Sequence, residues 1–168
     1  FTSLYVSASD VYKYLSFLRK NSDAFKAIGS SDAGVCITRS GNQYPGQMMI
    51  WNAFPSVEAA MIGSLKYDPY KATGPISNLR NIKHSTIWKS LKSFRLEPGH
   101  EIVGRFKVKQ ENISSFVKAM DSLEKEIQDN GHPDFFNGVF VSIAGGAESQ
   151  ILKVRSITSS ASDQGKIA

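Results

Sequence analysis

Four basic residues recur at alternate positions of two segments that are predicted to be strands. Arg105 and Lys107 lie in the first segment, and Lys153 and Arg155 lie in the second. Neighbouring side chains of a strand point to opposite faces, so each pair shares one face, while the apolar residues between them face the helices. We expect these four cations to line a common face that can hold negative charge.

The charge of this face leaves two interpretations open. The predicted alternation places no acidic side chain opposite the four cations. Burying unpaired charges costs several kcal/mol each. Either a small anion neutralises the cations, or the face is open to water and the cations are solvated.

An apolar wall is predicted to complete the ligand site. Met48 and Ile50 alternate along the segment 47–53 and share their predicted face with Asn52, while Trp51 is expected to face the helices. Ligand pockets usually combine an apolar lining with a few polar anchors, so a partly apolar anion would suit both walls. The predicted ligand-binding residues are Arg105, Lys107, Lys153, Arg155, Met48, Ile50 and Phe140.

Few residues are candidates for proton transfer. Tyr5 and Asn52 are predicted to face the site, and His84 and His100 flank a basic segment from which either could act as an acid or a base. Solvated loop histidines are the alternative. The chain has no nucleophile-elbow or phosphate-loop motif, and its three histidines lack metal-ligand spacing, so we expect no metal and no cofactor.

The second half of the chain carries the clearest elements. Residues 101–109 alternate apolar and polar side chains as a strand does, and residues 111–129 place their apolar side chains on one helical face. Asn130-Gly131 ends that helix. Strands at 139–144 and 150–156 follow, joined by a hairpin turn at Gly145-Gly146.

The first half repeats this order at an offset of 102 to 104 residues, as Gly29 aligned with Gly131 and Gly34 aligned with Gly138 show. A repeat this long predicts two copies of one supersecondary unit. The elements expected in the first copy are a strand at 3–7, a helix capped by Ser9 or Asp10 that runs to 20 and on to 28 past a weak point at 21–23, strands at 35–39 and 47–53, and a helix at 57–66. The matching last helix of the second copy, near Ser159, is expected to be short, frayed or missing.

The segment between the two copies is too long for a plain connection. Ile87, Trp88, Leu91 and Phe94 recur there at helical spacing after Ser85, which predicts a short amphipathic helix. The predicted division is therefore a first βαββα repeat at 1–67, a linker with this helix at 68–99, and a second βαββ repeat with a short C-terminal tail at 100–168.

This pattern resembles the dimeric α+β-barrel superfamily, which includes antibiotic-biosynthesis monooxygenase-like and NIPSNAP-like domains. The resemblance rests on the order of elements, on the helix stops at Gly29 and Gly131, on the glycine-rich hairpins and on the helix start Phe54–Ala60. It implies an α+β fold of two ferredoxin-like repeats with antiparallel sheets, forming a barrel within the chain or by homodimerisation. It also implies a cofactor-independent monooxygenase-like activity as one expectation, while the chemistry-bearing residues alone leave enzymatic activity open.

Composition and charge narrow the partners. The 168 residues carry a net charge of +5, and residues 80–109 hold eight basic and two acidic side chains. No apolar run is long enough for a membrane span. We expect a soluble protein, with a cytoplasmic location favoured and export left open because the first residue is Phe1.

A non-catalytic interaction or oligomerisation module is the alternative function. In that case the basic segment and the Trp88 helix would engage a partner or a second copy. Nucleic acid is a weaker prediction, because the segments 47–53 and 150–156 lack the exposed aromatic pattern with which an RNA-recognition sheet stacks bases.

Overall fold

The computed structural model describes residues 1–144 and 146–168 and has the predicted α+β class. Gly145, part of the predicted hairpin turn, lies outside the described residues. The chain divides into two compact units. The first unit comprises Phe1–Trp88 with Ile143–Ala147, and the second comprises Lys89–Ser142 with Glu148–Ala168.

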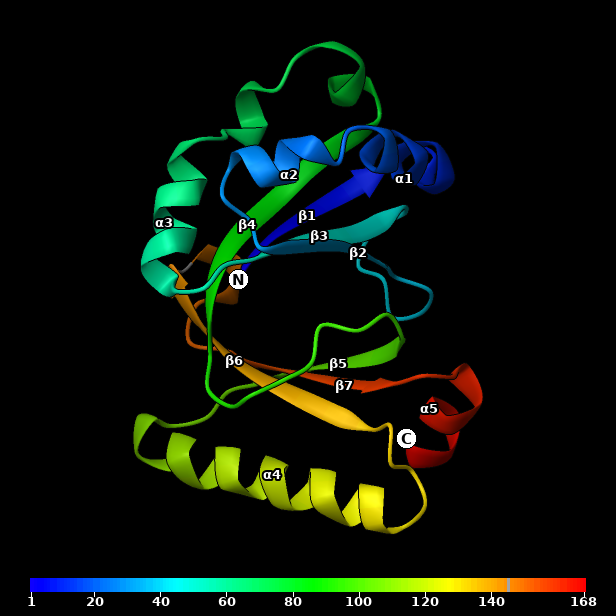
Figure 1. Ribbon diagram of the computed structural model, residues 1–168, viewed down its shortest axis with the longest axis vertical. Helices are drawn as coiled ribbons and strands as arrows, with labels where there is room; N and C mark the ends of the chain where they lie inside the picture. The colour runs from blue at the N-terminus through cyan, green and yellow to red at the C-terminus, as the bar shows by residue number, and fades with distance from the viewer. Residues whose placement is uncertain (145) are drawn as a thin grey trace. The chain divides into compact units, whose positions relative to one another are not determined.

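The first unit is an antiparallel sheet in the order β2-β3-β1-β4, and α1 and α2 lie over one of its faces (Figure 1). The predicted strands and helices form here with small shifts at their ends. The elements in chain order are β1 (Thr2–Ala8), α1 (Val11–Lys20), α2 (Asp23–Ala27), β2 (Asp32–Ile37), β3 (Gln47–Ala53), α3 (Val57–Leu65), the 3-10 helices η1 (Pro69–Lys71) and η2 (Gly74–Asn78), and β4 (Arg80–Ser90).

Local signals set the helix ends of this unit. The Asp10 carboxylate accepts a hydrogen bond from the Lys13 backbone N–H at 2.9 Å, so Asp10 caps α1 as expected. Ser56 caps α3 in the same way through the Ala59 N–H. The helices bury Tyr14 and Leu18 against the sheet in a core made of Val6, Ala8, Tyr14, Leu18, Met48, Ile50 and Leu79.

The predicted amphipathic helix at 85–94 is wrong, because residues 80–90 form β4. The spacing of Ile87, Trp88 and Leu91 does not by itself distinguish a helix from a strand. Along Arg80–Ser90 exposed residues alternate with less exposed ones, as in a strand. Trp88 is fully buried, and its indole N–H donates to the Ser3 hydroxyl at 2.8 Å. Trp88 is therefore a core residue of the first unit and not a contact surface for a partner.

A β-bulge changes the face that β4 presents. Tyr5 of β1 pairs with His84, but the next residue, Val6, pairs with Ile82, so Lys83 is the extra residue. Ile82 packs with the helix-side core, whereas His84 stacks on Tyr5. The even-numbered residues of β4 therefore face the helices before the bulge and the opposite side of the sheet after it.

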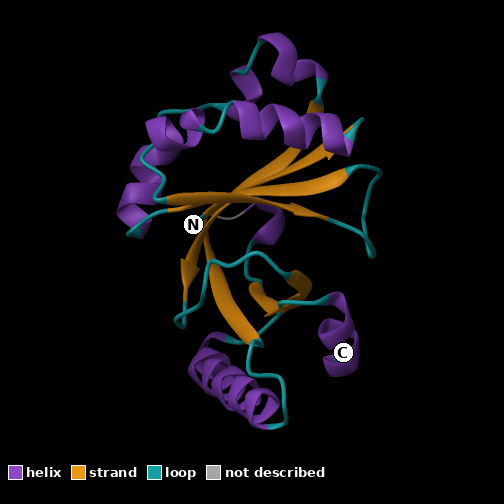
Figure 2. Cartoon of the chain, turned by 45° about the vertical axis from the view of Figure 1, so that its right-hand side comes forward, coloured by secondary structure: helices purple, strands orange, loops and turns teal. Residues whose placement is uncertain are grey.

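The second unit has the antiparallel strand order β6-β7-β5, with α4 along one face of these strands (Figures 1 and 2). The Phe106 and Phe116 rings, with centroids 5.4 Å apart, help to join the sheet to α4. Its elements are β5 (His100–Phe106), the 3-10 helix η3 (Gln110–Asn112), α4 (Ile113–Asp129), β6 (Phe136–Ala144), the 3-10 helix η4 (Gly146–Glu148), β7 (Leu152–Thr158) and α5 (Ala161–Ile167).

The C-terminal tail forms a helix. The Ser160 hydroxyl accepts a hydrogen bond from the Asp163 N–H at 3.0 Å and starts α5, which runs over seven residues. Of the three expected alternatives, a short, a frayed or a missing last helix, the structure has a short one. Whether the two units are copies of one ancestor stays a prediction, as does the division at residues 67 and 99. No helix in the described part of the chain is long and apolar enough to cross a membrane.

Candidate functional site

The strongest candidate site is a cluster of five ionisable side chains in the second unit, which we call the charged face. Lys153 and Arg155 of β7 alternate on one side of the strand, and their register partners on β5 are Arg105 and Val103. Phe140 of β6 pairs with Lys153 on the other flank. The strand register thus brings together four of the predicted ligand-binding residues, Arg105, Lys153, Arg155 and Phe140. The charged face consists of Glu101, Arg105, Glu148, Lys153 and Arg155.

Two carboxylates face these cations, which corrects the expectation that no acid would. The Arg105 Nε lies 3.2 Å from Glu148 Oε2, and the Arg105 Nη2 lies 3.2 Å from Glu148 Oε1. The Arg155 Nε donates to Glu101 Oε2 at 2.7 Å. Glu101 shares the alternation of Val103 and Arg105, so its place on this face could have been found in the sequence, whereas Glu148 comes from η4 and carries no periodic signal.

Lys153 lies at the centre of the charged face and is 0% exposed. Burial, followed by repulsion from Arg155, lowers the pKa of its ammonium from 10.5 to about 7, while Glu148 acts in the opposite direction. The amine of Lys153 therefore gains or loses a proton near neutral pH. A buried amine of this kind can hold an anion when protonated and accept a proton when neutral.

Aromatic rings adjoin the charged face. The Phe140 and Phe94 rings meet edge to face with centroids 4.8 Å apart. Gly138 makes room for this pair, since a Cβ atom there would lie 2.6 Å from the Phe140 ring. The charged face thus has an apolar flank within the same unit.

Lys107, the remaining predicted cation, does not join the cluster. β5 ends at Phe106, so Lys107 lies beyond the strand and is exposed. The alternation that we expected to run to residue 109 stops earlier.

The first unit corrects the predicted apolar wall. Met48 and Ile50 pack in the helix-side core, and Asn52 follows them on the same alternation of β3. The opposite face carries Met49 and Trp51, which pair with Tyr5 and Ser3. The predicted face of this strand is therefore wrong by one residue, because four successive apolar side chains in Met48–Trp51 leave the period undefined.

Two of the predicted catalytic residues do meet. The Tyr5 and His84 rings stack at a centroid distance of 4.4 Å and an interplanar angle of 22°. Asn52 lies on the other face of that sheet. His100 belongs to the second unit, where it is exposed at the start of β5 and pairs with Thr158. Tyr5 and His84 are thus the pair of candidates that the fold brings together.

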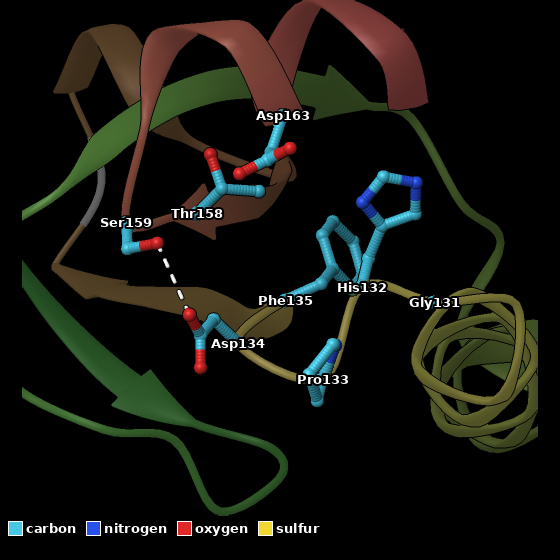
Figure 3. Close-up of a pocket in the computed structure, with 8 residues that line it drawn as sticks. All are labelled: Gly131, His132, Pro133, Asp134, Phe135, Thr158, Ser159 and Asp163. Atoms are coloured by element: carbon cyan, nitrogen blue, oxygen red, sulfur yellow. Dashed lines mark hydrogen bonds between the residues drawn. The ribbon is translucent and has the colours of Figure 1, made fainter.

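A cavity of about 190 Å³, lined mostly by polar residues, lies beside α5 in the second unit (Figure 3). His132 and Asp163 line it, and the Ser159 hydroxyl points at the Asp134 carboxylate, to which it donates at 3.1 Å. Hydrogen bonds, first from Ser160 and then from Lys166, hold the pKa of Asp163 below its ordinary value. The described residues contain no group of three or more His, Cys, Asp or Glu side chains that could hold a metal ion.

Comparison with known proteins gives no family. No protein-family model matches this chain, and no curated protein matches it. A solved structure of a proposed monooxygenase from Fusobacterium nucleatum subsp. nucleatum is 12% identical, with a TM-score of 0.49, over 99% of this chain and 78% of that chain. A solved heme-binding protein from Thermus thermophilus is 10% identical, with a TM-score of 0.47, over 99% of this chain and 79% of that chain. Both TM-scores lie below 0.5, so neither likeness says what this chain binds or does.

Proposed function

We propose that this chain binds a small, partly apolar anion at the charged face of its second unit. The observation that carries the proposal is the burial of Lys153 between two arginines, with its pKa lowered to about 7. The described residues of this face comprise three basic and two acidic side chains.

The surroundings of Lys153 favour a ligand with a carboxylate on an apolar body. Arg105 is the most accessible of the three cations, with its side chain 33% exposed, so it would meet the carboxylate first. The apolar body would lie along Phe94, which is partly accessible and packs edge to face on the fully buried Phe140. The bidentate geometry of a guanidinium suits a carboxylate, as its contact with Glu148 illustrates.

Proton uptake should accompany binding. A nearby anion stabilises the protonated form of Lys153, so the complex takes up a proton wherever the free amine is neutral. Affinity should therefore fall as the pH rises through about 7. Between pH 6 and 8.5 the expected loss is about tenfold or more if only the protonated form binds.

Calorimetric titration with benzoate and acetate at these two pH values tests the proposal. Benzoate should bind more tightly than acetate because it adds contact with the aromatic flank, and Lys153→Met should remove both the affinity and its pH dependence. Lys118→Met, which removes an exposed cation of α4, is the matched control and should leave binding unchanged. The absence of binding by either acid at millimolar concentration, or equal affinity in Lys153→Met, would overturn the proposal.

Tyr5 and His84 support a second candidate function, the oxygenase-like activity that the resemblance implies. Their stacked rings could exchange protons with a hydroquinone that dioxygen oxidises to a quinone. The hydroquinone gives up two electrons and two protons, which reduce one dioxygen to hydrogen peroxide. Oxygen uptake in the presence of hydroquinones measures this activity. Uptake that is equal in Tyr5→Phe, His84→Asn and the unchanged chain would count against it.

A further inference from the structure

A second cavity, separate from the charged face, lies wholly within the first unit. It has a volume of about 450 Å³, inside the range of roughly 300–1,000 Å³ that is typical of pockets for small ligands. The last turns of α1, the helix α2 and the edge strand β2 form its walls, and one side is open to solvent. Its lining consists of Leu15, Leu18, Arg19, Ser22, Phe25, Lys26, Ser30, Ser31, Asp32, Ala33, Gly34 and Val35.

The interior of this cavity is apolar. Leu15, Phe25 and Val35 line it and remain partly accessible, although each also packs against the helix-side core. Apolar surface that stays in contact with water is stabilised when a ligand covers it. The lining therefore favours a flexible hydrocarbon chain over a polar metabolite.

The charged side chains of the cavity lie at its rim, and they differ in whether they already form an ion pair or a hydrogen bond. Lys26 forms an exposed ion pair with Asp23 at 3.6 Å, and the Asp32 carboxylate accepts the Ala33 N–H at 2.7 Å. Arg19 forms no hydrogen bond or ion pair with any described residue, and the Ser22 hydroxyl makes no capping bond to α2. One guanidinium and one hydroxyl are thus available to a ligand.

We propose that this cavity binds a medium-chain fatty acid, with its carboxylate at Arg19 and its acyl chain against Leu15, Phe25 and Val35. A single negative charge at one end of a hydrocarbon chain matches one available guanidinium at the rim of an apolar lining. The proposal does not depend on anion binding at the charged face.

Decanoate, used below its micellar concentration, is the probe, and decanol is its uncharged counterpart. Amide NMR shifts locate the binding, and titration gives the affinity. Decanoate should shift the amides of α1, α2 and β2, and Arg19→Gln should weaken it about fivefold, the value of one exposed charge pair. Lys20→Gln removes the neighbouring cation, which does not line the cavity, and should leave the affinity unchanged. Decanol binding should be the same in all three proteins.

Three outcomes would overturn the proposal. Amides that all stay unshifted with decanoate would mean that the cavity takes no fatty acid. Equal weakening by Arg19→Gln and Lys20→Gln would mean that net charge, and not Arg19, attracts the ligand. Loss of decanoate binding in Lys153→Met, with Arg19→Gln unaffected, would assign the fatty acid to the charged face.

Discussion

The two sheets of this chain leave opposite kinds of surface on the side away from their helices. In the first unit that side carries the Tyr5–His84 stack and the hydrogen bond from Trp88 to Ser3. In the second unit it carries the charged face around Lys153. The side away from the helices therefore carries stacked aromatic rings in one unit and buried ion pairs in the other.

Both sheets contain a glycine that lies directly beside an aromatic ring. A Cβ atom at Gly34 would lie 2.4 Å from the Trp51 ring, and one at Gly138 would lie 2.6 Å from the Phe140 ring. Each sheet thus uses a glycine to let an aromatic ring lie close over its backbone. The comparison teaches that both sheets have a glycine beside an aromatic ring, while a few alternating positions set the electrostatics of each face.

The largest expected effect comes from removing an acid of the charged face. Glu148→Gln leaves Arg105 and buried Lys153 without that carboxylate, and breaking a buried pair costs about 3–5 kcal/mol. We expect a loss near the lower end, because Arg105 is partly exposed and Lys153 can release its proton. Urea unfolding at pH 7 measures the loss.

The control for this change is Glu97→Gln, which breaks the exposed pair with Arg95 at 3.5 Å. Surface pairs contribute about 0–1 kcal/mol, so this variant should be nearly as stable as the unchanged chain. Equal losses in the two variants would show that burial does not distinguish the charged face from an ordinary surface pair.

The next effect concerns pH. The folded-state pKa of Lys153 is about 7 and its ordinary value is 10.5, so between these values the unfolded chain holds a proton that the folded chain has released. Stability contributed by this group therefore rises with pH, by about 3 kcal/mol between pH 6 and 9.

Lys153→Met removes this contribution. The free energy of unfolding of Lys153→Met, minus that of the unchanged chain, should decrease by this amount from pH 6 to pH 9. Urea unfolding at several pH values measures it. A difference that does not vary with pH would mean that Lys153 keeps an ordinary pKa in the folded chain.

The smallest expected loss of stability concerns the face of the first unit that carries the Tyr5–His84 stack. Ser3→Ala leaves the buried indole N–H of Trp88 without its acceptor, which costs about 1–2 kcal/mol. This loss should be the same at pH 6 and 9, unlike that of Lys153. Ser7→Ala, which removes an exposed bond from the same strand, should cost less. A pH-dependent loss in Ser3→Ala would weaken the contrast between the two sheets.

Alternating polarity explains which parts of the site could be predicted from the sequence. In Leu152–Arg155 the cations Lys153 and Arg155 alternate with the apolar residues Leu152 and Val154, so the period of the strand defines both faces. Met48–Trp51 is apolar at every position, and its faces become apparent only when β1 and β4 are paired beside it. The elements themselves were predicted well, β3 at both of its ends, because caps and turn residues mark them locally.

Features that depend on contacts between distant segments were not predictable. Glu148 reaches Arg105 from a 3-10 turn, 43 positions along the chain, and no periodic pattern connects the two residues. The cavity beside β2 likewise depends on how α1 and α2 pack. β4 was mistaken for a helix because its apolar residues suit either period, and only its pairing with β1 decides between them.

The bulge at Lys83 has an evolutionary consequence. It separates Ile82, which serves the helix-side core, from His84, which stacks on Tyr5. Deleting one residue here would turn every side chain on one side of the deletion to the opposite face of the sheet. A point substitution would change one side chain and leave the direction of all the others unchanged. Lineages that carry this unit should therefore tolerate changes of side chain along β4 but preserve its length, so that insertions and deletions accumulate in the flanking loops.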